Sequence, residues 1–74
     1  MIFMKLTTSH ETNLKIIRMT KGYSQKQLAE LSGVSLRSIQ MYEQRHKNIN
    51  KAQSESLHRL AKVLGCTMEN LLEE

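Results

Sequence analysis

The stretch LAELSGVSLRSIQMYE, residues 28–43, decides how this chain folds. It holds two short amphipathic runs separated by only three residues, Gly33, Val34 and Ser35. Neither run would be a stable helix alone, because isolated helices shorter than about 12–15 residues are marginal in water. Both runs therefore need tertiary support, and the tight corner predicts two helices held at a fixed angle.

The corner is one of three similar units in the sequence. Each glycine is followed by an apolar or aromatic residue and then by Ser or Thr, at 22–24, 33–35 and 65–67. Glycine can end a helix in the left-handed conformation, and the hydroxyl can accept a hydrogen bond from a free N–H of the next helix. Ser24 also precedes Gln27 by three residues, the spacing of a capping box.

These units predict an all-α fold in one compact five-helix domain, since the 74 residues include no proline. The predicted helices cover residues 9–21, 25–32, 36–44, 51–64 and 68–73. Thr8 and Glu11 have the spacing of a capping box for the first helix. Residues 45–50 are predicted to form a loop, and residues 1–8 a flexible arm that precedes the domain at 9–74.

The helix at 36–44 has two different faces. Ile39, Tyr42 and Glu43 lie on one face, which suits a core. The other face repeats at i, i+3, i+4 and i+7 and carries Arg37, Gln40, Met41 and Gln44. This second face has no core to fill, so it is available to a partner.

The charge distribution suggests what that partner is. The net charge is +4, and residues 1–34 and 35–51 carry five and four Lys/Arg against two acids and one. Residues 52–74 carry two against four. A polyanion would be attracted to the first two thirds of the chain, as expected of a nucleic-acid binder. The alternative is that a mild positive charge only keeps a small protein in solution.

With these features in this order, residues 12–73 resemble the helix-turn-helix domains of the phage lambda repressor and Cro family, also called XRE-like. The resemblance is strongest in the helix-turn-helix unit at 25–44, with a small residue at Ala29, the turn at Gly33 and "YE" closing the second helix. "LAKVLG" followed by Thr67 also fits the family pattern. The chain departs from the family in a longer segment after Glu43, which lacks the usual glycine.

The resemblance implies that the outer face of the helix at 36–44 reads base edges in the DNA major groove. The implied base-contacting residues are Leu36, Arg37, Gln40 and Met41. Arg37 suits guanine O6 and N7, Gln40 suits adenine, and apolar side chains suit the thymine methyl group. The alternatives are that Arg37 pairs only with phosphate and that Leu36 packs on a neighbouring chain.

Phosphate contacts are expected at the start of the helix at 25–32, where free N–H groups and the helix dipole favour an anion. The resemblance assigns this role to Gln25. The other candidates are Ser24, Ser38, Arg45 and Lys47. The alternative for Ser24 is that it only caps the helix.

The resemblance also implies a structural ion pair between Arg18 and Glu43, which would orient the helix at 36–44. It implies a dimer interface at Leu71 and Leu72 in the last helix. The alternative is that these leucines complete the core of the monomer.

Other chemistry finds little support in the sequence. His10, His46 and His58 have no metal-ligand spacing with one another or with Cys66, so surface histidines and a core cysteine are expected. No phosphate-binding glycine loop or nucleophile motif is present, so we expect no enzyme, no metal and no cofactor. The lone cysteine and the absence of a signal-peptide pattern favour a cytoplasmic protein. The family resemblance implies a bacterial or phage origin.

We therefore expect a sequence-specific transcriptional regulator that binds double-stranded DNA, with the further expectation of a repressor that binds an inverted-repeat operator as a homodimer. The alternative hypothesis is an antitoxin or adaptor whose main role is to bind a protein. A toxin gene beside this one would favour the alternative.

Overall fold

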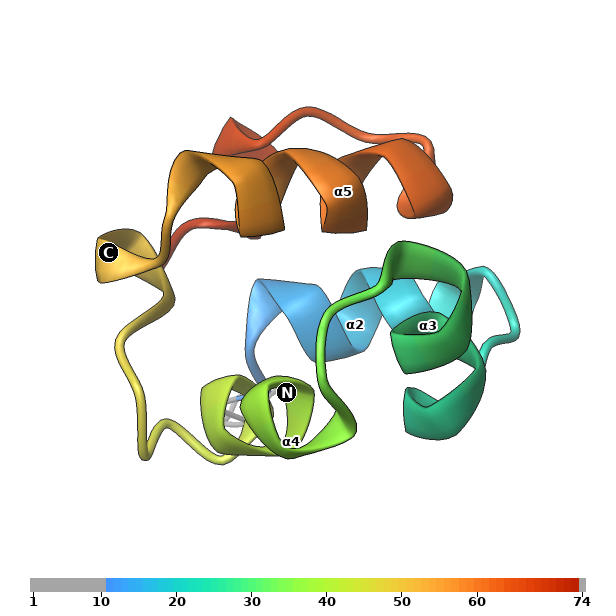
Figure 1. The fold of residues 1–74 in the computed structure, drawn as a ribbon, viewed down its shortest axis with the longest axis horizontal. Helices are drawn as coiled ribbons and strands as arrows, with labels where there is room; N and C mark the ends of the chain where they lie inside the picture. The colour runs from blue at the N-terminus through green and yellow to red at the C-terminus, as the bar shows by residue number, and fades with distance from the viewer. Residues whose placement is uncertain (1–10, 74) are drawn as a thin grey trace, which may run out of the picture.

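The computed structural model describes residues 11–73, and every regular element in that range is helical. Figure 1 shows α5 along one side of the molecule and α4 along the opposite side, with α2 and α3 between them. The described elements are α2 (Asn13–Thr20), α3 (Gln25–Ser32), α4 (Leu36–Glu43), η1 (Ile49–Lys51), α5 (Ser54–Leu64) and η2 (Glu69–Leu71), where η marks a 3-10 helix. The all-α prediction is confirmed. The arm predicted at 1–8 lies outside the described residues.

The core forms where the apolar faces of these short helices meet. α3 packs against both α4 and α5, and η2 packs against α2 and α5. The six largest fully buried side chains are Leu14, Leu28, Ile39, Leu60, Leu64 and Leu71. Every described α-helix contributes to this set, which supplies the tertiary support that none of them has alone.

The predicted capping units are confirmed at the helix boundaries. Ser24 caps α3 in a full capping box with Gln27, and Ser35 accepts a hydrogen bond from the N–H of Ser38 at the start of α4. Gly33 ends α3 with a φ of 78°, and its N–H donates to the Ala29 carbonyl. The chain therefore turns from α3 into α4 within three residues because one residue can adopt the left-handed conformation.

The first and last predicted helices were too long. α2 begins at Asn13 because Thr12 has an extended backbone and caps the helix by accepting from the Lys15 N–H. The capping box predicted for Thr8 and Glu11 is wrong in its described part, since Glu11 precedes the helix and pairs with Lys15. The last helix is only the 3-10 turn Glu69–Leu71, because the backbone of Leu72 is already extended.

The helix predicted at 51–64 begins later, at Ser54. Asn48 caps a separate 3-10 turn at Ile49–Lys51, and Ala52 and Gln53 are extended. Ile49 is buried, so this turn anchors the segment between α4 and α5 to the core. In the part of the chain that the structure describes, no helix is both long and apolar enough to cross a membrane.

Candidate nucleic-acid interface

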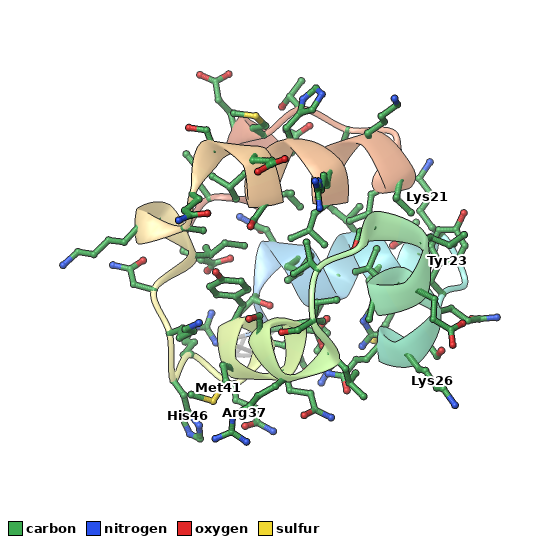
Figure 2. All side chains as sticks on the ribbon, viewed as in Figure 1. Lys21, Tyr23, Lys26, Arg37, Met41 and His46 are labelled. Atoms are coloured by element: carbon green, nitrogen blue, oxygen red, sulfur yellow. The ribbon has the colours of Figure 1, made fainter. Side chains whose placement is uncertain are left out.

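The outer face of α4 presents the residues that the sequence singles out for base contact. Ile39, Tyr42 and Glu43 are buried on the inner face, as the periodicity predicts. Leu36 and Arg37 are exposed at the start of the helix, and Gln40 and Met41 are half-buried further along it. Figure 2 shows Arg37 and Met41 pointing away from the body of the molecule on the same side of α4.

A buried ion pair holds the inner face of α4 in place. Arg18 Nε and Nη2 donate to the two carboxylate oxygens of Glu43 at 2.7 and 3.0 Å, and Arg18 Nη1 donates to the Tyr23 carbonyl at 2.8 Å. The Glu43 side chain is only 2% exposed. Because one guanidinium donates to both carboxylate oxygens, this pairing fixes the relative orientation of the two side chains as well as their separation. The end of α4 is therefore oriented against α2 and against the turn that precedes α3.

Gln25 extends this network to the start of α3. Its side-chain nitrogen donates to Glu43 Oε1 at 2.9 Å. An amide nitrogen carries two hydrogens, so the second remains able to donate to a phosphate. Glu43 thus connects α4, which holds the candidate base-contacting residues, to Gln25, a candidate contact of the DNA phosphates. Sequence reasoning missed this link.

The predicted phosphate-contacting serines both take part in capping. Ser24 Oγ accepts from the Gln27 N–H, and Ser38 Oγ accepts a hydrogen bond from the Ser35 hydroxyl at 2.9 Å. Each of these hydroxyls still has a hydrogen of its own to donate. The N–H groups of Gln25 and Lys26 lie in the same first turn of α3, where intrahelical acceptors are lacking.

The two predicted loop contacts have partners on the protein. Arg45 Nη2 lies 3.3 Å from Glu73 Oε1, and Lys47 Nζ lies 5.6 Å from the centre of the Tyr42 ring. Both side chains are exposed. Glu73 therefore competes with a phosphate for Arg45, whereas the ring beneath Lys47 leaves its charge available.

A hollow of about 420 Å³ lies beside α4 on the side of the segment that leads into α5. It is lined by Ser38, Tyr42, Lys47, Asn48, Lys51, Ala52, Gln53 and Ser56. Sequence reasoning missed Lys51, Gln53 and Ser56, although Lys51 ends the basic segment at 35–51. Two lysines at one hollow next to α4 suit the phosphate backbone of a nucleic acid.

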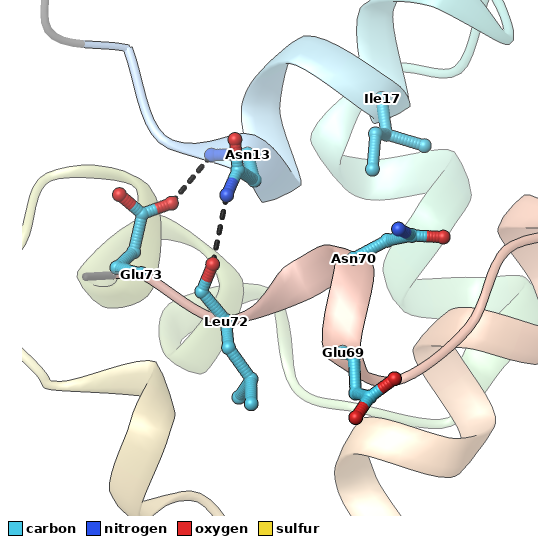
Figure 3. Close-up of a pocket in the computed structure, with 6 residues that line it drawn as sticks. All are labelled: Asn13, Ile17, Glu69, Asn70, Leu72 and Glu73. Carbon is cyan, nitrogen blue, oxygen red and sulfur yellow. Dashed lines mark hydrogen bonds between the residues drawn. The ribbon is translucent and has the colours of Figure 1, made fainter.

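A second hollow, of about 750 Å³, has the opposite character. Figure 3 shows Glu69 and Glu73 among its lining residues, together with Asn13, whose side chain donates to the Leu72 carbonyl at 2.7 Å. Two carboxylates disfavour a polyanion at this place. Of these two hollows, the one beside α4 is therefore the one that suits a phosphate backbone.

Leu71 was predicted at a dimer interface, and its burial corrects that prediction. Its side chain is 0% exposed and packs in the core of the same chain, so it follows the alternative reading. Leu72 is half-buried and borders the core. Only Leu72 of the two leaves apolar surface for another molecule.

The described histidines and the cysteine form no metal site. Within residues 11–73, no group of three or more His, Cys, Asp or Glu side chains could hold a metal ion. Cys66 is half-buried against the core. Burial raises the pKa of the Cys66 thiol above its ordinary value, and the nearby Lys21 ammonium partly opposes this effect. His10 lies outside the described residues.

Comparisons with known proteins agree with this geometry. A helix-turn-helix family model matches residues 14–71. The fold is similar to a solved structure, the N-terminal DNA binding domain of SinR from Bacillus subtilis, with a TM-score of 0.73 and 30% sequence identity over 82% of this chain and 86% of that one. No curated protein matches the sequence significantly. The chain therefore belongs to the XRE-like helix-turn-helix family of DNA-binding transcriptional regulators.

Proposed function

We propose that this regulator is a repressor that binds an inverted-repeat operator as a homodimer, with the outer face of α4 in the major groove. The observation that carries the proposal is the division of α4, whose inner face is held by the Arg18–Glu43 pair while Arg37 is exposed on the outer face. A side chain that recognises a base must be held in a fixed position relative to the DNA. The buried pair fixes the position of α4 and so of its exposed side chains.

The base-contacting set is Leu36, Arg37, Gln40 and Met41. Arg37 donates to the O6 and N7 atoms of guanine, and Gln40 pairs with adenine. The apolar side chains of Leu36 and Met41 contact thymine methyl groups. Leu36 is 37% exposed although it is apolar, which fits a side chain that is covered when DNA binds.

The phosphate-contacting set flanks these residues on both sides. It comprises Ser24, Gln25, Ser38, Arg45 and Lys47, with Lys51 added from the basic hollow. Gln25 is oriented by Glu43, so the backbone contact and the reading helix move as one unit. A homodimer would present α4 twice, with half-sites about 34 Å apart along the duplex. Leu72 would contribute to that dimer, and the protein would act at the DNA in the cytoplasm.

Selection of bound duplexes from a random pool tests the proposal on three proteins, the parent, Arg37→Ala and Lys47→Ala. Arg37→Ala should cost about 1–3 kcal/mol on the preferred operator and relax the preference at one base pair in each half-site. Lys47→Ala should weaken binding to all sequences about equally. It should also reduce the slope of log affinity against log salt concentration by about one.

Three results would contradict parts of this proposal. An unchanged base preference for Arg37→Ala would indicate that Arg37 contacts only the DNA phosphate backbone. A selected site without two-fold symmetry would count against the homodimer. Binding of the parent to no duplex at low salt, or binding that does not weaken as salt rises, would count against recognition of DNA by this face.

A further inference from the structure

The short turn η1 points its three side chains in three different directions. A 3-10 helix has three residues per turn, so Ile49, Asn50 and Lys51 lie about 120° apart around its axis. Ile49 is buried in the core, whereas Asn50 and Lys51 are exposed. Lys51 lines the basic hollow beside α4. The contacts of Ile49 and Asn50 fix two of the three directions and therefore determine where Lys51 points.

Asn50 is held by the C-terminal segment. Its side-chain Oδ1 accepts from the Glu73 N–H at 2.8 Å, and its Nδ2 donates to the Glu73 carbonyl at 2.5 Å. An amide can pair with both backbone groups of one residue, because it carries an acceptor and a donor side by side. In Figure 1 the red C-terminal segment accordingly runs to η1. The rotation of η1 is therefore fixed by a residue 23 positions away.

The C-terminal segment is itself anchored at the start of α2. The Glu73 carboxylate accepts from the Asn13 N–H at 2.6 Å, and the Asn13 side chain donates to the Leu72 carbonyl at 2.7 Å (Figure 3). The last turn of α2 carries Arg18, which pairs with Glu43 of α4. One end of α2 thus holds α4, and the other end holds η1 through the C-terminal segment.

We propose that Asn50 is a positioning residue for DNA binding, which fixes η1 so that Lys51 is held in place for the phosphate backbone. The inference rests on the proposed function and adds to it a residue that acts through Lys51 without touching DNA. Without its bonds to Glu73, the turn is still anchored by Ile49 but can rotate about that anchor. Binding must then supply the cost of ordering it.

A double-mutant cycle tests whether Asn50 acts through Lys51. Fluorescence anisotropy measures the affinity for a selected duplex at several salt concentrations, for the parent, Asn50→Ala, Lys51→Ala and the double variant. Lys51→Ala should reduce the slope of log affinity against log salt concentration by about one. Asn50→Ala should weaken binding about two- to tenfold without changing the base preference, because DNA must order the turn. In the Lys51→Ala background, the same change should weaken binding by less than about twofold.

Asn70→Ala is the matched control. The Asn70 side chain accepts from the Thr67 N–H at 3.0 Å and lines the acidic hollow, so the variant loses a similar hydrogen bond far from the basic hollow. It should lower the free energy of unfolding and leave DNA affinity and its salt dependence unchanged. Circular dichroism verifies that each variant is folded at the assay temperature. Asn50→Ala keeps the backbone N–H that Asn48 caps at 2.9 Å, so η1 can still form. If Asn50→Ala does not fold, Asn50→Ser takes its place in the cycle with the same expected coupling.

Two results would overturn this inference and leave the proposed function intact. One is an Asn50 variant that binds like the parent, or that weakens binding equally with and without Lys51. The other is a Lys51→Ala variant with the affinity and salt dependence of the parent. Failure of the parent to bind any duplex would overturn the proposed function and this inference together.

Discussion

Two arginine–glutamate pairs in this molecule have the same closest separation and opposite surroundings. Arg18 Nε lies 2.7 Å from Glu43 Oε2, and Arg59 Nη2 lies 2.7 Å from Glu55 Oε2. The side chains of the first pair are 10% and 2% exposed, and those of the second are 50% and 71% exposed. Distance therefore says little about the contribution of an ion pair. The two pairs differ in the free-energy cost of removing one partner, because the remaining charge of a buried pair is not solvated by water.

The largest expected effect comes from breaking the buried pair. Glu43→Ala leaves the Arg18 guanidinium in the interior without its carboxylate and removes the acceptor of Gln25. We expect a loss of about 3–5 kcal/mol in the free energy of unfolding. Urea denaturation measures it. A loss below about 1 kcal/mol would show that water reaches Arg18 and that the two pairs differ less than their exposure indicates.

Replacing both members of the buried pair should separate its contribution to stability from its contribution to DNA binding. Arg18→Met combined with Glu43→Leu removes both charges, and apolar replacements of buried ion pairs are often neutral or stabilising. We expect stability within about 1–2 kcal/mol of the parent, since the Tyr23 carbonyl still loses a donor. DNA affinity should nevertheless fall, because Gln25 is no longer oriented. A double variant that binds the operator like the parent would mean that the pair contributes stability alone.

An intermediate case lies at the end of the described chain. The Glu73 carboxylate accepts from the Asn13 N–H at 2.6 Å and pairs with Arg45, and its side chain is 24% exposed. Glu73→Ala should cost about 1 kcal/mol, the usual net value of one hydrogen bond with a weak ion pair. Thermal unfolding followed by circular dichroism would measure this cost. A loss of unfolding free energy as large as that expected for Glu43→Ala would show that Glu73 behaves like the buried Glu43.

The smallest effect is expected for the exposed pair. Glu55→Ala should cost about 0.3–0.5 kcal/mol, as for other i,i+4 pairs on helix surfaces. The difference from the parent should vanish near 1 M salt, where the screening length is about 3 Å. The loss in Glu43→Ala should persist at the same salt concentration. Equal salt sensitivity in the two variants would contradict the distinction between the pairs.

The sequence alone determined the parts of this molecule that depend on neighbours along the chain. The tight turn at Gly33 and the caps at Ser24 and Ser35 were predictable, because a cap involves only residues three or four positions apart. The inner and outer faces of α4 were also predictable, since helical periodicity alone separates Ile39 from Arg37. The candidate base-contacting residues followed from that periodicity together with the family resemblance.

The helix ends that were predicted wrongly are tied to distant residues. Glu73 donates its N–H to the Asn50 side chain and accepts from the N–H of Asn13, the first residue of α2, which is 60 positions away. These bonds hold the segment after η2 extended, where the sequence pattern predicted a further turn of helix. No local pattern can indicate where the segment after η2 leaves the helix, because its partners Asn13 and Asn50 lie in other parts of the chain.

At the candidate interface, only the tertiary structure decided which polar groups act together. It brought Gln25 to Glu43 across 18 positions, buried Leu71 inside the monomer and tied Asn50 to Glu73 across 23 positions. Periodicity describes the faces of one helix and contains no information on which other helix meets each face. The sequence therefore determined which residues were available for DNA, and packing between helices decided how they are held and which residues join them.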